Sequence, residues 1–155
     1  LIGLMLAVLL IGLIFVFINN LNFRYLFVSL IPNLLPLFSC LGISSLFGFY
    51  ISLSNAFIFA IVFGLIVDDS VHIISAYTVS RKRNKSITES IKYCHENTFH
   101  AVIKTTLVII VSLIPLLLSE FTSISQLASV TITAALIALV FDILFLPYLL
   151  SKYIR

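Results

Sequence analysis

The chain has 155 residues, of which 61% are hydrophobic and only 10% charged, and its formal net charge is +3. Soluble domains are nearer half apolar and a quarter charged, so the composition excludes an ordinary soluble domain and predicts several membrane spans. The few basic residues lie beside apolar segments, which argues against nucleic-acid binding. Cys40 and Cys94 show no disulfide or metal-site spacing, and we expect neither a metal nor a cofactor.

The apolar runs predict five membrane helices, because a helix needs about 20 apolar residues to cross a hydrocarbon core of roughly 30 Å. The five predicted helices cover about residues 2–18, 25–50, 53–77, 101–118 and 124–150. Pro32 and Pro36 indicate a kink near the start of the second helix, and Asn33 between them suits a bond to a neighbouring helix. The predicted fold class is therefore an all-α membrane protein.

The sizeable polar segment of the chain covers residues 80–100. Ser86 and Glu89 have the S-x-x-E spacing of a capping box, which predicts that a helix starts there. Apolar side chains then recur at helical spacing, so we expect a short amphipathic helix over about residues 87–97 on the cytoplasmic membrane face. We expect this helix to serve as a connector packed beneath the bundle.

All lysines and arginines follow the first, third and fifth predicted helices or open the fourth, and the loops near residues 50–54 and 120–125 carry none. Basic loops stay on the cytoplasmic side. The pattern predicts a multi-pass protein of the cell inner (plasma) membrane, with its N-terminus outside and its C-terminus in the cytoplasm. Because the chain begins at Leu1 inside an apolar run, we expect the single transmembrane domain 1–155 to be a fragment of a longer protein.

Three carboxylates share one depth in the predicted bundle. Asp68 and Asp69 lie about 12 residues before Arg81, which is roughly 18 Å along a helix, and Asp142 lies about 10 residues before Lys152, or roughly 15 Å. A carboxylate near the bilayer midplane is costly and usually faces a protein interior or a water cavity on an ion or proton path. We therefore expect a cluster of this kind to pass protons.

The chemistry of such a cluster suits proton transfer. Burial disfavours the charged form of a carboxylate, a second carboxylate disfavours it further, and the pair titrates as a unit. Adjacent helical residues project about 100° apart, so Asp68 and Asp69 cannot face the same point, and the sequence leaves open which of them faces a relay. His72 lies one turn after Asp68. We predict a proton relay of Asp68, Asp69, Asp142 and His72; the alternative is that these side chains only bond neighbouring helices.

Four further residues accompany the predicted relay. Gly64 lies one turn before Asp68, where a missing side chain allows a close approach of helices. Thr105, Thr106 and Ser112 are candidate polar neighbours in the fourth predicted helix, with Ser112 at the depth of the carboxylates and the threonines nearer the inner face.

The segment Gly64-Leu65-Ile66-Val67-Asp68-Asp69 resembles the GxxxDD motif of the resistance–nodulation–division (RND) superfamily, in particular its MMPL-type exporters and Patched-like proteins. The resemblance covers nearly the whole chain in the same order. Its other parts are IPNLLP at residues 31–36, DDSVHIISAY at 68–77, the threonines at 105 and 106, and FDILFLP at 141–147.

The resemblance implies five of the twelve membrane helices of such a transporter, in an RND/MMPL-type half-bundle, with the C-terminal half favoured. It implies partners in the other transmembrane half and the periplasmic porter domains of the same polypeptide, membrane lipids, a lipidic or hydrophobic substrate, and possible homo-oligomers. In the family, the motif aspartates relay the protons that drive export, so the resemblance implies a secondary-active transporter module rather than an enzyme. Many members have Asp-Tyr in place of Asp-Asp, which leaves open whether both Asp68 and Asp69 are needed.

Two other functions fit part of this pattern. A sterol-sensing domain has the same five-helix architecture but acts in lipid sensing or sterol transport, and the paired aspartates favour the exporter over it. An intramembrane aspartyl protease also needs two aspartates on different helices. Its motifs are not matched, because Gly64 stands four rather than two residues before Asp68 and no Pro-Ala-Leu sequence occurs.

Overall fold

The computed structural model describes residues 24–46 and 53–154, together with six single positions between residues 6 and 17. Within these residues the regular elements are all helical. Four helical segments are long and apolar enough to cross a membrane, at residues 27–45, 60–82, 87–117 and 122–153, which is compatible with a multi-pass membrane protein. The predicted first helix, about residues 2–18, lies mostly outside the described residues.

The first two long helices are α2 (Arg24–Leu46) and α3 (Leu53–Lys82). Helix α2 stays continuous through Pro32 and Pro36. Helix α3 runs five residues beyond the predicted end at Tyr77, so that prediction was too short. It ends where Asn84 adopts a left-handed backbone with φ of 58°, a conformation that asparagine tolerates better than most residues and that a helix cannot continue through.

Helix α4 (Ile87–Cys94) begins at the predicted capping box. The Ser86 amide donates to Glu89 Oε2 at 2.7 Å, and the Glu89 amide donates to Ser86 Oγ at 3.2 Å, so this prediction is confirmed. The helix then passes without a break into the π-helical turn η1 (His95–Phe99) and into α5 (His100–Leu117). The segments predicted as an amphipathic helix over 87–97 and a separate span over 101–118 are therefore one continuous helical segment.

The last helical segment of the chain also consists of two α-helices joined by a π-helical turn. Helix α6 (Thr122–Val140) continues through the π-helical turn η2 (Phe141–Phe145) into α7 (Leu146–Tyr153), which corresponds to the predicted fifth helix. A π-turn holds one more residue than an α-turn and is frequent at functional sites. One π-turn thus precedes α5 and the other follows α6.

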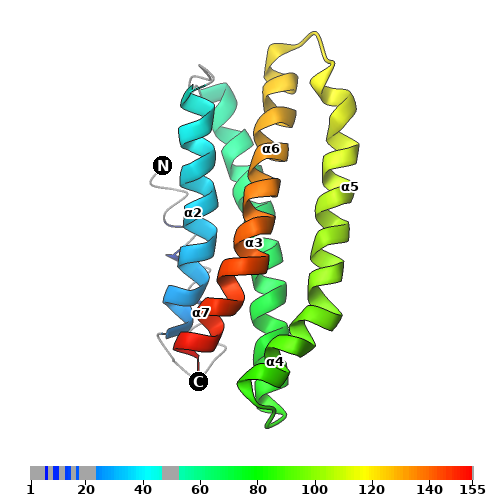
Figure 1. Cartoon of the computed structure of the whole chain (residues 1–155). Helices are drawn as coiled ribbons and strands as arrows, with labels where there is room; N and C mark the ends of the chain where they lie inside the picture. Colours follow the sequence, from blue (N-terminus) through cyan, green and yellow to red (C-terminus); the bar gives the residue numbers. More distant parts are fainter. Residues whose placement is uncertain are drawn as a thin grey trace.

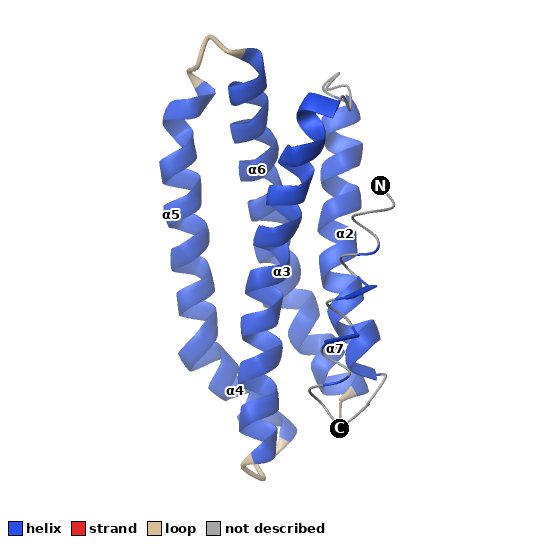
Figure 2. Ribbon diagram, turned by 180° about the vertical axis from the view of Figure 1, so that it is seen from behind, coloured by secondary structure: helices blue, strands red, loops and turns tan. Residues whose placement is uncertain are grey.

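Helix α6 lies in the middle of the bundle and contacts α2, α3 and α5 (Figure 1). It stands in front of α3 in Figure 1 and behind it in the reverse view of Figure 2. The start of α2, the α3–α4 turn and the end of α7 lie at one end of the bundle, called here the α4 end, and the α5–α6 turn lies at the other (Figure 1).

Over the described ranges, two of the three apolar clusters in the interior lie on either side of one polar level of α3. Toward the α5–α6 turn, Val62 and Ile66 pack against Ala134 and Ala138 of α6. Toward the α4 end, a larger cluster gathers around buried side chains of α3, α4, α5 and α7, namely Ile73, Ile74, Tyr77, Cys94, Val102, Leu146 and Leu150. The aspartates of α3 lie between these clusters, so apolar packing on both sides fixes their level.

Candidate functional site

Asp142 is held inside the bundle by a serine of another helix. Both Asp142 and Ser70 are fully buried, and the Ser70 hydroxyl donates to Asp142 Oδ1 at 2.6 Å, which joins α3 to η2. The other carboxyl oxygen, Oδ2, has no hydrogen-bond partner among the described residues. Asp142 is therefore a sealed carboxyl group with one donor and one unpartnered oxygen.

Asp69 lies beside this pair and faces α5. It is 8% exposed, and its carboxyl group interacts electrostatically with that of Asp142. The buried hydroxyl of Thr106 lies within hydrogen-bonding reach of Asp69 and donates to the Val102 carbonyl at 2.8 Å. That hydroxyl therefore has two oxygen neighbours, the Val102 carbonyl and the carboxyl group of Asp69. Two carboxyl groups and two hydroxyls from α3, α5 and η2 thus meet at one level.

Asp68 points away from this cluster. Its carboxylate lies 3.6 Å from Nε2 of His72, and the two side chains are 72% and 66% exposed. His72 and Asp68 therefore share one face of α3. The structure also answers which aspartate of the adjacent pair faces Asp142: it is Asp69.

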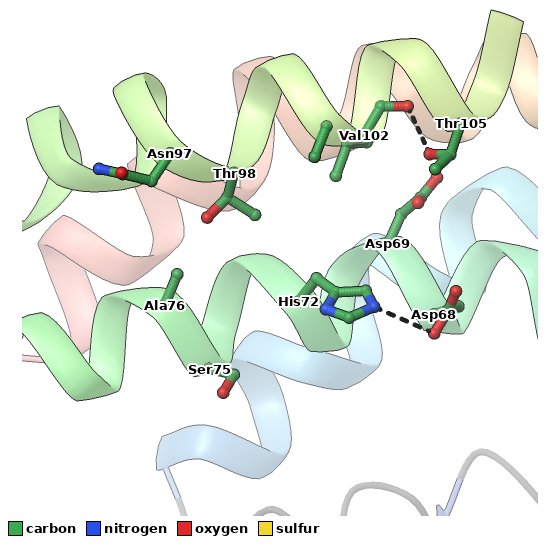
Figure 3. Close-up of a pocket in the computed structure, with 10 residues that line it drawn as sticks. Asp68, Asp69, His72, Ser75, Ala76, Asn97, Thr98, Val102 and Thr105 are labelled. Atoms are coloured by element: carbon green, nitrogen blue, oxygen red, sulfur yellow. Dashed lines mark hydrogen bonds and ion pairs between the residues drawn. The ribbon is translucent and has the colours of Figure 1, made fainter.

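A cavity of about 360 Å³ lies between α3, η1 and α5. Figure 3 shows its two walls, with Asp69 beside Thr105 at one end and Asn97 and Thr98 opposite Ala76 at the other. The Thr105 hydroxyl donates to the Val102 carbonyl at 2.9 Å. The lining residues are Asp68, Asp69, His72, Ser75, Ala76, Asn97, Thr98, Ala101, Val102 and Thr105.

Two predicted site residues lie apart from this arrangement. Ser112 is on an exposed side of α5, where its hydroxyl donates to the Ile109 carbonyl of its own helix at 2.9 Å. Gly64 was expected to permit a close helix approach, but among the described residues no atom of another segment comes within 4 Å of the position that a Cβ would take. The packing reason given for Gly64 is therefore wrong for these helices, since its face of α3 is exposed.

Three residues that the sequence did not mark as site residues belong to the site. Ser70 follows the aspartate pair directly, but nothing in the sequence shows that it faces Asp142 rather than lipid. Asn97 ends the predicted amphipathic helix over 87–97 and Thr98 follows it, and both reach the cavity because η1 continues into α5. Over the ranges 24–46 and 53–154, no group of three or more histidine, cysteine, aspartate or glutamate side chains could hold a metal ion.

No protein-family model matches the chain, and no curated protein or solved structure is significantly similar to it. A function for this chain has to be inferred from its residues and their geometry.

Proposed function

We propose that this chain is the proton-translocating membrane module of a secondary-active exporter, similar to the MMPL-type members of the RND superfamily, that moves lipids or hydrophobic compounds. The observation that carries the proposal is the meeting of Asp69 and Asp142, from α3 and η2, between two apolar clusters inside a bundle of membrane-type helices. The resemblance of residues 64–69 to the GxxxDD motif supports the choice of family.

The geometry suits a proton carrier because a buried carboxyl group is stable mainly as the neutral acid. Within the part of the chain that the structure describes, an ionised Asp142 would have a single donor, Ser70, and an oxygen without a partner. An uncompensated buried charge costs several kcal/mol or more, so the group is expected to hold a proton whenever the site is closed. Asp69, at the edge of a cavity, can exchange that proton with water, and the two groups titrate together.

The wider assembly follows from this role. The α4 end, with Arg81, Lys82, Arg83 and Lys85, would face the cytoplasm, because basic loops are retained there. The module would lie in the plasma membrane and work with a second transmembrane half and with porter domains outside the membrane. Copies of the parent protein could also associate as homo-oligomers. A sterol-sensing role has no comparable need for two carboxyl groups that meet at one level inside the bundle.

Proton flux in proteoliposomes that hold the full-length parent protein tests the proposal. Under an imposed pH gradient, with a pH-sensitive dye inside the vesicles, Asp69→Asn and Asp142→Asn should abolish substrate-dependent proton uptake. Glu96→Gln, an exposed change outside the site, serves as the control and should leave the flux unaltered. Asp68→Asn should reduce the flux less than Asp69→Asn, because Asp68 does not contact the buried cluster.

Each variant must elute as a folded, inserted protein before its flux is interpreted. Wild-type flux in both Asp69→Asn and Asp142→Asn would refute the relay, and a lipid-sensing or scaffolding role would then be the better account.

A further inference from the structure

We propose that the cavity between α3, η1 and α5 is a water-filled vestibule that connects the α4 end of the bundle with Asp69 and stops short of Asp142. As a route for protons it rests on the proposed function. As a water-accessible space inside a membrane protein it can be tested independently of transport.

The cavity offers water polar partners along its lining. Seven of the ten lining residues carry a polar or ionisable side chain, and the other three, Ala76, Ala101 and Val102, are small. A cavity holds water when it is polar and roomy, and a water molecule in the liquid takes up about 30 Å³. The cavity of about 360 Å³ therefore has room for several water molecules with polar partners.

The lining forms a continuous path along two helical faces. The wall on α3 comprises Asp69, His72 and Ala76, and the opposite wall comprises Thr98, Ala101 and Thr105. Both sets recur at intervals of three or four residues, which is the spacing of one helix face. At the outer end the Asn97 side chain is exposed and its amide donates to the Tyr93 carbonyl at 2.9 Å. Water that enters beside η1 thus meets polar groups as far as Asp69.

The vestibule reaches the carboxyl group of Asp69 but not the more deeply buried carboxyl group of Asp142. Asp69 borders the cavity, whereas Asp142 does not line it and is sealed with Ser70 between α3 and η2. Of the two carboxyl groups in the buried cluster, Asp69 is therefore the one that exchanges protons with water on the α4 side. Asp142 exchanges its proton only through the neighbouring groups of the cluster.

Cysteine accessibility in the full-length parent tests the vestibule. The background carries Cys40→Ala and Cys94→Ala, since both native cysteines are free thiols. Thr98→Cys, Ala101→Cys and Thr105→Cys should react with a charged, membrane-impermeant methanethiosulfonate added from the α4 side. Val108→Cys is the matched control on α5, because Val108 is 67% exposed but does not line the cavity. Val108→Cys should react at least about tenfold more slowly than the cavity positions, because the reactive thiolate is disfavoured in lipid.

Reaction of Thr105→Cys, seven residues deeper along the segment than Thr98→Cys, is the decisive result. Labelling at Thr98→Cys alone would mean that the cavity is only a shallow surface depression. Equal labelling of Val108→Cys would mean that the cavity is no more accessible to water than the outer surface of α5. Either result overturns the proposal. If a variant fails to fold, Ala76→Cys and Ser75→Cys probe the α3 wall of the same space. If the cavity cysteines are labelled but the parent protein shows no proton flux, the vestibule is supported and the proton relay is refuted. If the parent shows proton flux but these cysteines are not labelled, the relay is supported and the vestibule is refuted.

Discussion

The hydrogen bond from Ser70 to Asp142 is a contact whose contribution to stability can be measured directly. Ser70→Ala removes the hydroxyl with little change in volume and leaves both oxygens of a fully buried carboxyl group without a donor. Hydrogen bonds between neutral groups of membrane helices average about 0.6 kcal/mol in mutant cycles, and bonds to a charged group contribute about 1.5–3 kcal/mol. We expect Ser70→Ala to lower the free energy of unfolding within that range, about 0.6–3 kcal/mol.

A double-mutant cycle with Asp142→Leu isolates the pair, because leucine has a similar size and cannot accept the bond. The assay is equilibrium unfolding of the full-length protein in mixed detergent–lipid micelles. Ser112→Ala is the control, since this exposed hydroxyl bonds only its own helix, and it should change the free energy of unfolding by less than about 0.5 kcal/mol. We expect a coupling near 0.6 kcal/mol, because the proposed relay holds Asp142 neutral in the closed site; a coupling of about 2–3 kcal/mol would indicate an ionised Asp142 and contradict that assignment.

A coupling energy of about 0.3 kcal/mol or less, the level at which independent sites simply add, would refute the contact. The link between α3 and η2 would then have no energetic role, and the assignment of Asp142 to the cluster would lose its main geometric support.

Three further predictions concern the α4 end of the bundle. Tyr77→Phe removes a buried hydroxyl that donates to the Ile154 carbonyl at 2.8 Å, and it should cost about 0.5–1.5 kcal/mol in equilibrium unfolding. Leu146→Ala should cost about 2–5 kcal/mol because this side chain is fully buried, whereas Leu144→Ala, at a 70% exposed position nearby, should cost far less in the same assay. Ser86→Ala breaks the capping box and should destabilise the start of α4 by about 1 kcal/mol, seen as faster amide hydrogen exchange there; unchanged exchange would contradict that account.

The depth argument from the sequence placed Asp69 and Asp142 at one level, and the structure brings them together. Depth needs only the rise per residue and the basic residues that mark the helix ends. The capping box at Ser86 was equally predictable, because its hydrogen bonds are local in sequence.

Which side of each helix faces inward could not be predicted in the same way. Apolar residues surround α3 on all sides near its aspartates, so no stripe distinguishes the face of Asp69 from that of Asp68. The π-turns were not predicted for a related reason. The extra residue of a π-turn depends on how the helices pack, and the amino-acid composition does not show where that happens. Ser70, Asn97 and Thr98 became site residues only through this packing.

The two π-turns also indicate where the chain can lose a residue. Deleting one residue within an α-helix turns everything beyond it by about 100°, which would carry Thr106 away from Asp69 if the deletion fell early in α5. A deletion inside η1 or η2 can instead be absorbed, because a π-turn shortened by one residue becomes an ordinary α-turn with the following helix face preserved. Length variation between chains with this fold would then concentrate at these two turns.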